Sequence, residues 1–357
     1  MATTERPELV PAGAGGLGAA VASETGTELG EITEIKARGY WEQVWRRFRR
    51  DRFAIAGGIF VILLILIAFV GAPIASHLLG HGPNDQYSAG AVSQDTLLPV
   101  GPWTHIEKAP YPGAVGHFGK TLFILGADGQ LGRDEFLRLL YGAQVSLEVA
   151  VGATIMGMLI GVLMGSLAGF YKGWVDTVVS RVTEITMAFP VLLFVIALSS
   201  TVGDRIDNIT LGFLHQGVIT LVLVLGIFGW FYPARIIRAV VLSLREKEFI
   251  EAARMTGASD FRIIRSHLLP HLVAPIIVYS TLVVAQNVLA EAGLSFLGLG
   301  IKLPNASWGN MLSDATNFYT QVPWLMLWPG LAVLLTTLSF NLLGDGLRDA
   351  FDPRGSR

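Results

Sequence analysis

The stretch FAIAGGIFVILLILIAFVGAPIA, residues 53–75, contains no charged side chain. About 20 helical residues cross a hydrocarbon core about 30 Å thick, so this run is long enough to span a membrane once. Basic and aromatic side chains immediately before such a run are typical of an anchor at the membrane surface. Those side chains are Trp41, Trp45, Arg46, Arg47, Phe48, Arg49, Arg50 and Arg52. We therefore predict a cytoplasmic tail and interfacial anchor over residues 1–52, followed by a first transmembrane helix over residues 53–75.

The composition of the rest of the chain also indicates a membrane protein. Hydrophobic residues make up 52% of the chain and charged residues only 15%, against roughly 25% charged residues in a soluble domain. Segments in lipid must satisfy every backbone N–H and C=O internally, and no alternation of period two indicates a barrel, so each span is expected to be helical. Five further spans are predicted: Val145–Phe170, Val178–Val202, Gly217–Ile236, Leu272–Ala290 and Val322–Gly344. The predicted fold is an all-α integral membrane protein with six transmembrane helices.

The distribution of positive charge predicts the orientation of these helices. With the N-terminus inside, 20 Lys and Arg residues fall on the inner side and six on the outer side. Positive charge is enriched in cytoplasmic loops, so both termini are expected inside. This places a long connection, residues 76–144, outside, and we expect its part from residue 83 to 130 to fold as a small cap, because nearly 70 residues is long for a structureless loop. A helical core over residues 145–346 and a cytoplasmic C-terminus over residues 347–357 follow.

Several classes of function are excluded by the residues that are missing. The chain has no cysteine and a net charge of −2, so neither a thiolate metal site nor a strongly basic nucleic-acid surface is expected. The segment ending in Gly119-Lys120-Thr121 has Ala114 where a phosphate-binding loop needs its first glycine. His267 and His271 are spaced like zinc ligands, but Leu268 replaces the glutamate of that motif. We predict no enzyme activity and no cofactor bound by this chain.

A second decisive stretch is EAARMTGASDFRIIRSHLLP, residues 251–270, on the predicted inner side. It combines a helix-forming run, a glycine suited to a turn at Gly257, a second helix with Phe261, Ile264 and Leu268 on one face, and a proline that would stop it at Pro270. Such a helical hairpin could dock into a groove on a partner protein or rest on the lipid surface. The pattern alone leaves both interpretations open.

The order of residues in this stretch resembles the EAA loop of ABC importer permeases. The shared features are E-A-A, three residues, G, nine residues and then H-L-L-P. In that family the loop, here residues 242–271, holds the coupling helix that contacts the ATP-binding subunit. The resemblance assigns this coupling role to Glu251, Ala252, Ala253, Gly257, Ala258, Phe261, His267, Leu268, Leu269 and Pro270.

Three other stretches resemble the C-type permeases of the dipeptide, oligopeptide and nickel family. They are EAGLSFLGLG at residues 291–300, NLLGDGLRD at residues 341–349, and LGRDEFLRLLYGA at residues 131–143, where Leu137 replaces the usual serine. The resemblance implies a type I ABC importer permease fold and alternating access in the cell membrane. It also implies four kinds of partner: a homologous second permease, two ATP-binding subunits that hold ATP and magnesium, an extracytoplasmic solute-binding protein, and a peptide substrate. A nickel or other small-solute importer remains the alternative, and a stand-alone channel or membrane enzyme is a distant one.

Two sets of residues inside the spans attract attention. Gly157, Gly161, Gly165 and Gly169 recur every four residues, which favours close packing of another helix over a ligand path. Gln286, Asn287, Glu291 and Ser295 are polar positions in and just after the fifth predicted span. Hydrogen bonds between helices explain them more simply than a translocation path, but we keep all four as path candidates.

Overall fold

The computed structural model describes residues 39–108, 119–188, 190, 193, 196–198 and 217–352. Two compact units are distinguished, Met1–Gln43 and Val44–Arg357. Helix α1 (Tyr40–Phe48) begins in the first unit. All the following elements belong to the second unit.

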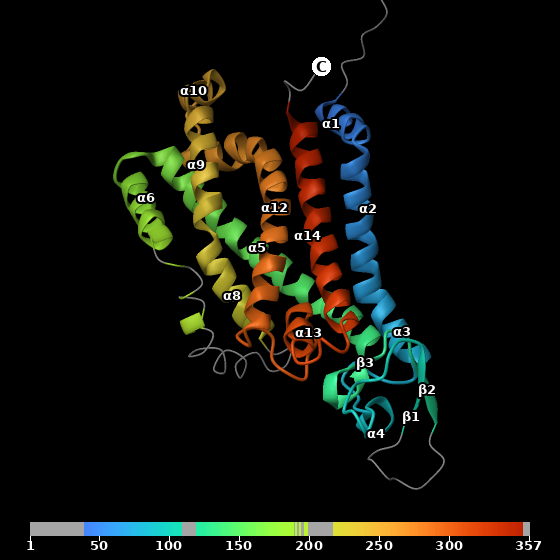
Figure 1. Ribbon diagram of the computed structural model, residues 1–357. Helices are drawn as coiled ribbons and strands as arrows, with labels where there is room; N and C mark the ends of the chain where they lie inside the picture. Colours follow the sequence, from blue (N-terminus) through green and yellow to red (C-terminus); the bar gives the residue numbers. More distant parts are fainter. Residues whose placement is uncertain are drawn as a thin grey trace, which may run out of the picture. The chain divides into compact units, whose positions relative to one another are not determined.

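Long apolar helices dominate the second unit (Figure 1). In the part of the chain that the structure describes, four continuous helical stretches are long and apolar enough to cross a membrane, and the pair α8 and α9, bent by 40°, provides a fifth. The helical membrane fold is thereby confirmed. Of the third predicted span, residues 178–188, 190, 193 and 196–198 are described, and α6 (Gly173–Ala188) covers its beginning. The stretches are Arg52–Leu79, Glu135–Tyr171, Asp260–Phe296 and Trp324–Phe351, and the bent pair is Val218–Gly229 with Phe231–Arg245.

These stretches are assembled from the following helices. The first contains α2 (Arg52–Leu66), the π-helix η1 (Ile67–Gly71) and α3 (Ala72–Leu79). The second is α5 (Glu135–Tyr171), and the bent pair is α8 (Val218–Gly229) and α9 (Phe231–Arg245). Next come α10 (Glu248–Met255), α11 (Asp260–Arg262), the π-helix η3 (Ile263–Leu268), α12 (Leu269–Phe296), α13 (Trp308–Ala315) and α14 (Trp324–Phe351).

Two aspartates start the first two long helices. The Asp51 carboxylate accepts hydrogen bonds from the backbone N–H groups of Phe53 and Ala54 at 2.9 and 3.1 Å. Asp134 does the same at the start of α5. Each carboxylate thus satisfies backbone donors that the first helical turn leaves free.

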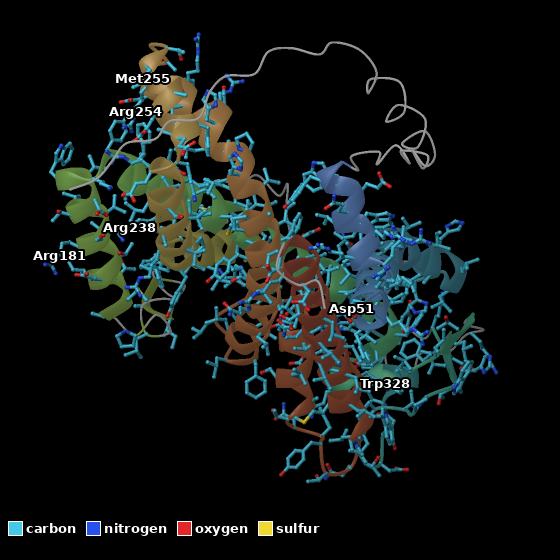
Figure 2. All side chains as sticks on the ribbon, turned by 90° about the horizontal axis from the view of Figure 1, so that it is seen from above. Asp51, Arg181, Arg238, Arg254, Met255 and Trp328 are labelled. Atoms are coloured by element: carbon cyan, nitrogen blue, oxygen red, sulfur yellow. The ribbon has the colours of Figure 1, made fainter. Side chains whose placement is uncertain are left out.

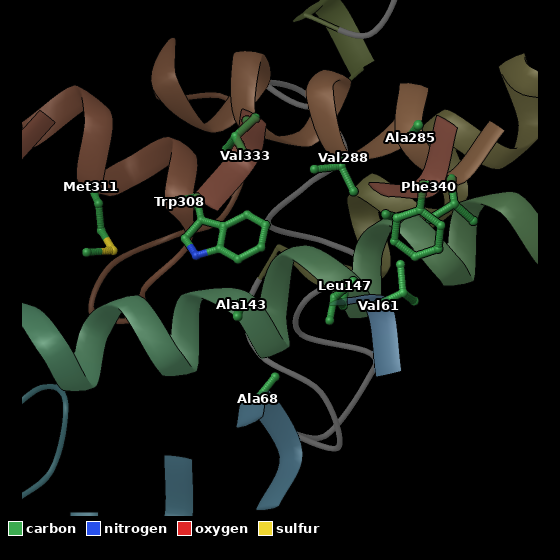
Figure 3. Close-up of a cluster of buried hydrophobic side chains, with 13 residues drawn as sticks. Val61, Ala68, Ala143, Leu147, Ala285, Val288, Trp308, Met311, Val333 and Phe340 are labelled. Atoms are coloured by element: carbon green, nitrogen blue, oxygen red, sulfur yellow. The ribbon is translucent and has the colours of Figure 1, made fainter. Parts of the chain in front are cut away.

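The main core lies where α2, α5, α12, α13 and α14 meet (Figure 3). The Trp308 side chain is 1% exposed, and its indole N–H donates to the carbonyl of Leu139 at 3.1 Å. A buried indole needs such a partner, because an unpaired buried donor costs about 1–3 kcal/mol. Trp308 therefore fixes α13 against α5. The cluster contains Val61, Ala68, Ala143, Leu147, Ala150, Val284, Ala285, Val288, Ala292, Trp308, Met311, Val333 and Phe340.

The segment between α3 and α5 folds as a cap, residues 80–134, around a small core of its own. A short helix, α4 (Ser88–Ala91), lies beside an antiparallel pair, β1 (Thr104–Glu107) and β2 (Lys120–Phe123), in which Thr104 pairs with Phe123. A second pair follows, β3 (Ala127–Asp128) and β4 (Arg133–Asp134), joined by the 3-10 helix η2 (Gly129–Leu131). The buried hydrophobic cluster of the cap is formed by Ala91, Ile106, Phe123 and Ala127.

The cap adds two small sheets, which were not predicted, to the predicted helical membrane fold. The helical prediction holds for the membrane stretches, but the cap contains the two small sheets just described. Strands of two to four residues carry too few alternating positions to produce a detectable period-two pattern. In Figure 1 the cap and α10 lie at opposite ends of the long helices.

A candidate coupling corner and two polar clusters

The resemblance to the EAA loop concerns a helical corner, defined here as residues 246–268, between α9 and α12. Helix α10 ends at Met255, and Gly257, two residues later, has a φ of +80°. The Gly257 N–H donates to the carbonyl of Arg254 at 2.9 Å, and the Ala258 N–H donates to that of Ala253 at 3.0 Å. Glycine adopts this left-handed conformation without a Cβ penalty, so Gly257 allows the chain to reverse direction here.

One side of the coupling corner is buried against the ends of other helices. Ile250, Ile263 and Leu268 are each 0% exposed and pack with Phe170 of α5 and Ile237 of α9. A fully buried side chain of this size contributes about 1.5–3 kcal/mol. The corner is therefore attached firmly to α5 and α9.

Arginine contacts strengthen the attachment of the corner to α5. The Arg254 guanidinium lies 5.5 Å from the centre of the Phe170 ring, and that of Arg245 lies 6.0 Å from it. Arg245 also donates from Nη1 to the carbonyl of Phe170 at 2.5 Å. These contacts stabilise the last turn of α5, because cations are attracted both to aromatic faces and to helix C-termini.

The opposite side of the corner is exposed. Met255 is 90% exposed and Phe261 70% exposed, and both lie beside charged side chains. Figure 2 shows Arg254 and Met255 projecting from the end of the corner. Large exposed apolar side chains among charges are typical of a surface that another protein covers.

Two expectations about this stretch are wrong in detail. Phe261 and Leu268 do not share an apolar face, because Phe261 is exposed whereas Leu268 is 0% exposed. Pro270 does not stop a helix either; it is the second residue of α12, which continues directly from the π-helix η3. The helix instead runs without interruption from Asp260 to Phe296.

The ten residues assigned to coupling by resemblance divide by exposure. Glu251, Ala252, Gly257, Phe261, Leu269 and Pro270 are exposed, Ala258 and His267 are half-buried, and Ala253 and Leu268 are buried.

Near its other end, α12 contains a buried carboxylate. Glu291 is 0% exposed. Ser146 of α5 and Ser295 of α12 each donate a hydroxyl to its two oxygens at 2.7 Å, and Ser307 is a third hydroxyl partner. Ser295 in turn accepts the N–H of Ile301 at 3.1 Å. Glu291 and Ser295 thus connect α5, α12 and the segment before α13.

The four path candidates therefore have different surroundings. Glu291 and Ser295 are internal, and Asn287 is half-buried and donates to the Thr154 hydroxyl of α5 at 2.9 Å. Gln286 is exposed. Of the four, only Gln286 presents its side chain to the surface of the chain. The partners Ser146 and Ser307 were missed, although an acidic residue in a predicted span signals that hydrogen-bonding partners must exist.

The glycine series of α5 faces α8 and α9. A Cβ built on Gly165 would lie 2.5 Å from the carbonyl oxygen of Ala234, and one on Gly169 would lie 2.9 Å from that of Arg238. Contacts shorter than 3.0 Å require the neighbouring backbone to move. These glycines thus allow α5 and α9 to approach closely.

A second polar cluster, unforeseen from the sequence, lies at the base of the cap. Arg133 and Arg138 are almost fully buried, and each approaches Asp128 Oδ2 at 2.7 Å. Arg133 also reaches Asp314 of α13 at 3.2 Å. Burial raises the pKa of the Asp128 carboxyl, and the positive charges of Arg138 and Arg133 oppose the increase. The cluster joins the cap to α5 and α13.

Comparison with known proteins agrees with this architecture. Residues 157–357 match the family described as "Binding-protein-dependent transport system inner membrane component", and residues 39–99 match "N-terminal TM domain of oligopeptide transport permease C". The glutathione transport system permease protein GsiD of Escherichia coli O6:K15:H31 is 38% identical over 319 residues, covering 89% of this chain and 92% of that protein.

Two further similarities were found. GsiD of Pectobacterium atrosepticum is 35% identical over 323 residues, covering 90% of this chain and 94% of that protein. A chain of the MetNI methionine ABC transporter in an inward-facing conformation is 18% identical, with a TM-score of 0.48, covering 61% of this chain and 97% of that chain. The family match and the GsiD alignments together show that the chain belongs to the binding-protein-dependent transport system inner membrane components, as a multi-pass permease subunit that leaves ATP hydrolysis to separate subunits.

Proposed function

We propose that this chain is the permease subunit of an ATP-driven importer for small peptides, with the coupling corner docked on an ATP-binding subunit. The observation that carries the coupling role is the two-sided corner: Ile250 and Leu268 anchor it to α5 and α9, while Met255 and Phe261 remain exposed. Force applied to the exposed side is transmitted to α9 and α12, because tightly packed elements move as rigid bodies.

The peptide substrate is supported by the relatives. GsiD is described as part of a glutathione transport system, and glutathione is a tripeptide. Residues 39–99 also match the N-terminal domain of an oligopeptide permease. A peptide carries an ammonium and a carboxylate that a solute-binding protein can select before delivery to the permease.

The remaining partners follow from the same proposal. A homologous second permease completes the pathway, two ATP-binding subunits hold ATP and magnesium, and an extracytoplasmic binding protein supplies the substrate. Both termini and the corner lie in the cytoplasm and the cap outside, in line with the excess of Lys and Arg on the predicted inner side. Closure of the ATP-binding subunits would draw the corners together and switch the pathway between inward- and outward-facing states.

Transport by the reconstituted complex tests both parts of the proposal. Glutathione, a dipeptide panel and Ni²⁺ are each supplied with the binding protein, and uptake and ATP hydrolysis are measured. Peptides should stimulate both; stimulation by Ni²⁺ alone would refute the peptide assignment.

For the coupling role, Glu251→Lys reverses one exposed charge on the corner, and Glu107→Lys reverses one in the cap, where the carboxylate lies 3.8 Å from Lys120. Only Glu251→Lys should abolish stimulated hydrolysis and uptake, because like charges brought together at a docking surface strongly disfavour association. Equal activity of the two variants would refute the coupling assignment.

A further inference from the structure

Helix α6 is joined to the rest of the unit in an unusual way. Lys172 and Gly173, between α5 and α6, have φ of +54° and +60°. A Cβ built on Gly173 would meet nothing within 4 Å. Among the described residues of α6, Thr183 is buried and the others are exposed or half-buried. The turn between α5 and α6 is loosely packed and the surface of α6 is little buried. Few apolar contacts therefore fix the angle of α6 relative to α5 and α9.

Charged side chains provide the attachment that the apolar surface does not. Asp176 of α6 accepts two hydrogen bonds from the Arg238 guanidinium of α9, one from Nε and one from Nη2 at 2.7 Å. The two side chains are 20% and 33% exposed. A paired geometry of this kind fixes direction as well as distance, which a single lysine contact does not. A weaker contact, Lys172 Nζ to Glu246 Oε1 at 3.1 Å, joins the residues that cap the C-termini of α5 and α9.

Beside this ion pair the two helices are separated by a cavity. It has a volume of about 420 Å³, and its lining includes Thr177, Ser180, Glu184 and Arg235 as well as the paired residues. A solvated gap cannot transmit displacement in the way that a packed interface can. Among the described residues, the Asp176–Arg238 pair is therefore the strongest contact by which α9 can hold α6.

Helix α9, in contrast, is fixed to the coupling corner. A Cβ on Gly169 would lie 2.9 Å from the backbone oxygen of Arg238 itself, so this residue belongs to the close α5–α9 contact. Ile237, its neighbour, is 1% exposed and belongs to the cluster that anchors the corner. A displacement of the corner therefore reaches Arg238 through packed atoms.

We propose that Asp176 and Arg238 form a latch that makes α6 move with the coupling corner during transport. This proposal rests on the proposed coupling function and adds positioning residues to it. With the latch closed, each movement of α9 carries α6. Without it, the ATP-binding subunits still move the corner, but α6 does not follow fully, and less peptide is taken up for each ATP hydrolysed.

The test measures peptide taken up per ATP hydrolysed in proteoliposomes containing the whole complex and its binding protein. Asp176→Asn and Arg238→Gln should each lower this ratio by about fivefold, within the range found for mutations that weaken coupling. Peptide-stimulated hydrolysis should remain. The exchanged variant Asp176→Arg/Arg238→Asp should restore the ratio, because it re-forms the pair with opposite polarity.

Arg181→Gln is the matched control. Arg181 lines the same cavity, but it is 73% exposed and pairs with Glu184 of its own helix at 2.7 Å, so its loss removes an equal charge without breaking a contact between α6 and α9. Its ratio should equal that of the unmodified complex. Three results would each refute the latch. They are a normal ratio of uptake to hydrolysis in both single variants, an equal fall of hydrolysis and uptake, and an exchanged variant that remains uncoupled. If the proposed coupling function itself is wrong, Glu251→Lys will transport peptide normally, which distinguishes that failure from failure of the latch.

Discussion

At Gly257 the backbone, not the space around it, restricts substitution. Its φ is +80°, and a Cβ would meet nothing within 4 Å. We predict that Gly257→Val distorts the coupling corner at a cost of about 1–3 kcal/mol, because a β-branched residue strongly disfavours this conformation. Peptide-stimulated ATP hydrolysis of the assembled complex should be lost.

Gly257→Asn is the control for that prediction. Asparagine tolerates the left-handed conformation far better than valine, so most of the stimulation should survive. Equal loss in both variants would show that something other than backbone conformation matters at this turn.

Gly165 presents the opposite situation, because there the space is the restriction. We predict that Gly165→Ala forces α5 and α9 apart and destabilises the subunit by about 1–3 kcal/mol, as overpacking does. The added Cβ would lie 2.5 Å from the carbonyl of Ala234. Thermal unfolding of the purified complex in detergent measures the effect as a lower melting temperature.

The matched control is Gly293→Ala in α12, where a Cβ would meet nothing within 4 Å. It should leave the melting temperature unchanged or raise it slightly, because alanine favours a helix over glycine by about 1 kcal/mol. A melting temperature for Gly165→Ala as high as that of this control would contradict the close packing of α5 on α9.

At the scale of elements, the attachment of the cap depends on His81. Its Nε2 lies 2.9 Å from Asp134 Oδ2, and its Nδ1 lies 3.1 Å from the hydroxyl of Thr121. Asp134 is also the residue that caps α5. The side chain of His81 thus connects strand β2 of the cap with the first turn of α5.

We predict that His81→Ala loosens the cap, because it leaves the buried Asp134 carboxylate without this partner, a loss of about 1–3 kcal/mol. Limited proteolysis of the complex should then cut within residues 80–108 and 119–134 several times faster. His105→Ala, at an exposed position of β1, is the control and should leave the rate unchanged. Identical digestion of the two variants would mean that other contacts hold the cap.

The elements that could be predicted from the sequence are those with a long run of apolar residues. Residues 53–75 fall within the stretch Arg52–Leu79, and the predicted span Leu272–Ala290 falls within Asp260–Phe296. The ends of these helices were not predicted. The length of an apolar run indicates where the chain crosses the membrane, whereas the helix itself continues as far as capping and packing allow. Pro270 shows this, since a proline at a helix start cannot be distinguished by sequence alone from one that ends a helix.

The polar sites could be predicted only in part. Glu291 was identified because an acidic residue in an apolar span is conspicuous. The cluster around Asp128 was not, since it joins Arg133, Arg138 and Asp314, which lie in separate elements. Pairings of that kind depend on tertiary structure, and local spacing carries no information about them.

At the scale of the whole molecule, the proposed orientation can be tested directly. The chain contains no cysteine, so single cysteines report their own accessibility. We predict that a membrane-impermeant thiol reagent added to intact cells labels Gln94→Cys in the cap and spares Asp349→Cys near the end of α14. Both positions are exposed in the structure.

Permeabilised cells provide the control, because both cysteines should then react. Labelling of Asp349→Cys but not Gln94→Cys in intact cells would show that the topology is the reverse of the proposed one. The coupling corner would then lie on the side of the membrane without ATP, and the proposed function would fail with it.

The uninterrupted helical stretch Asp260–Phe296 also affects how the subunit tolerates different lipids. Its 37 residues extend about 55 Å at about 1.5 Å per residue, whereas a bilayer with its headgroups is about 40–45 Å thick. Residues 260–268, which belong to the corner, account for this surplus, so this part of the corner extends beyond the headgroups. A bilayer thicker by a few ångströms would cover the base of the corner, so docking of the ATP-binding subunits would depend on membrane thickness.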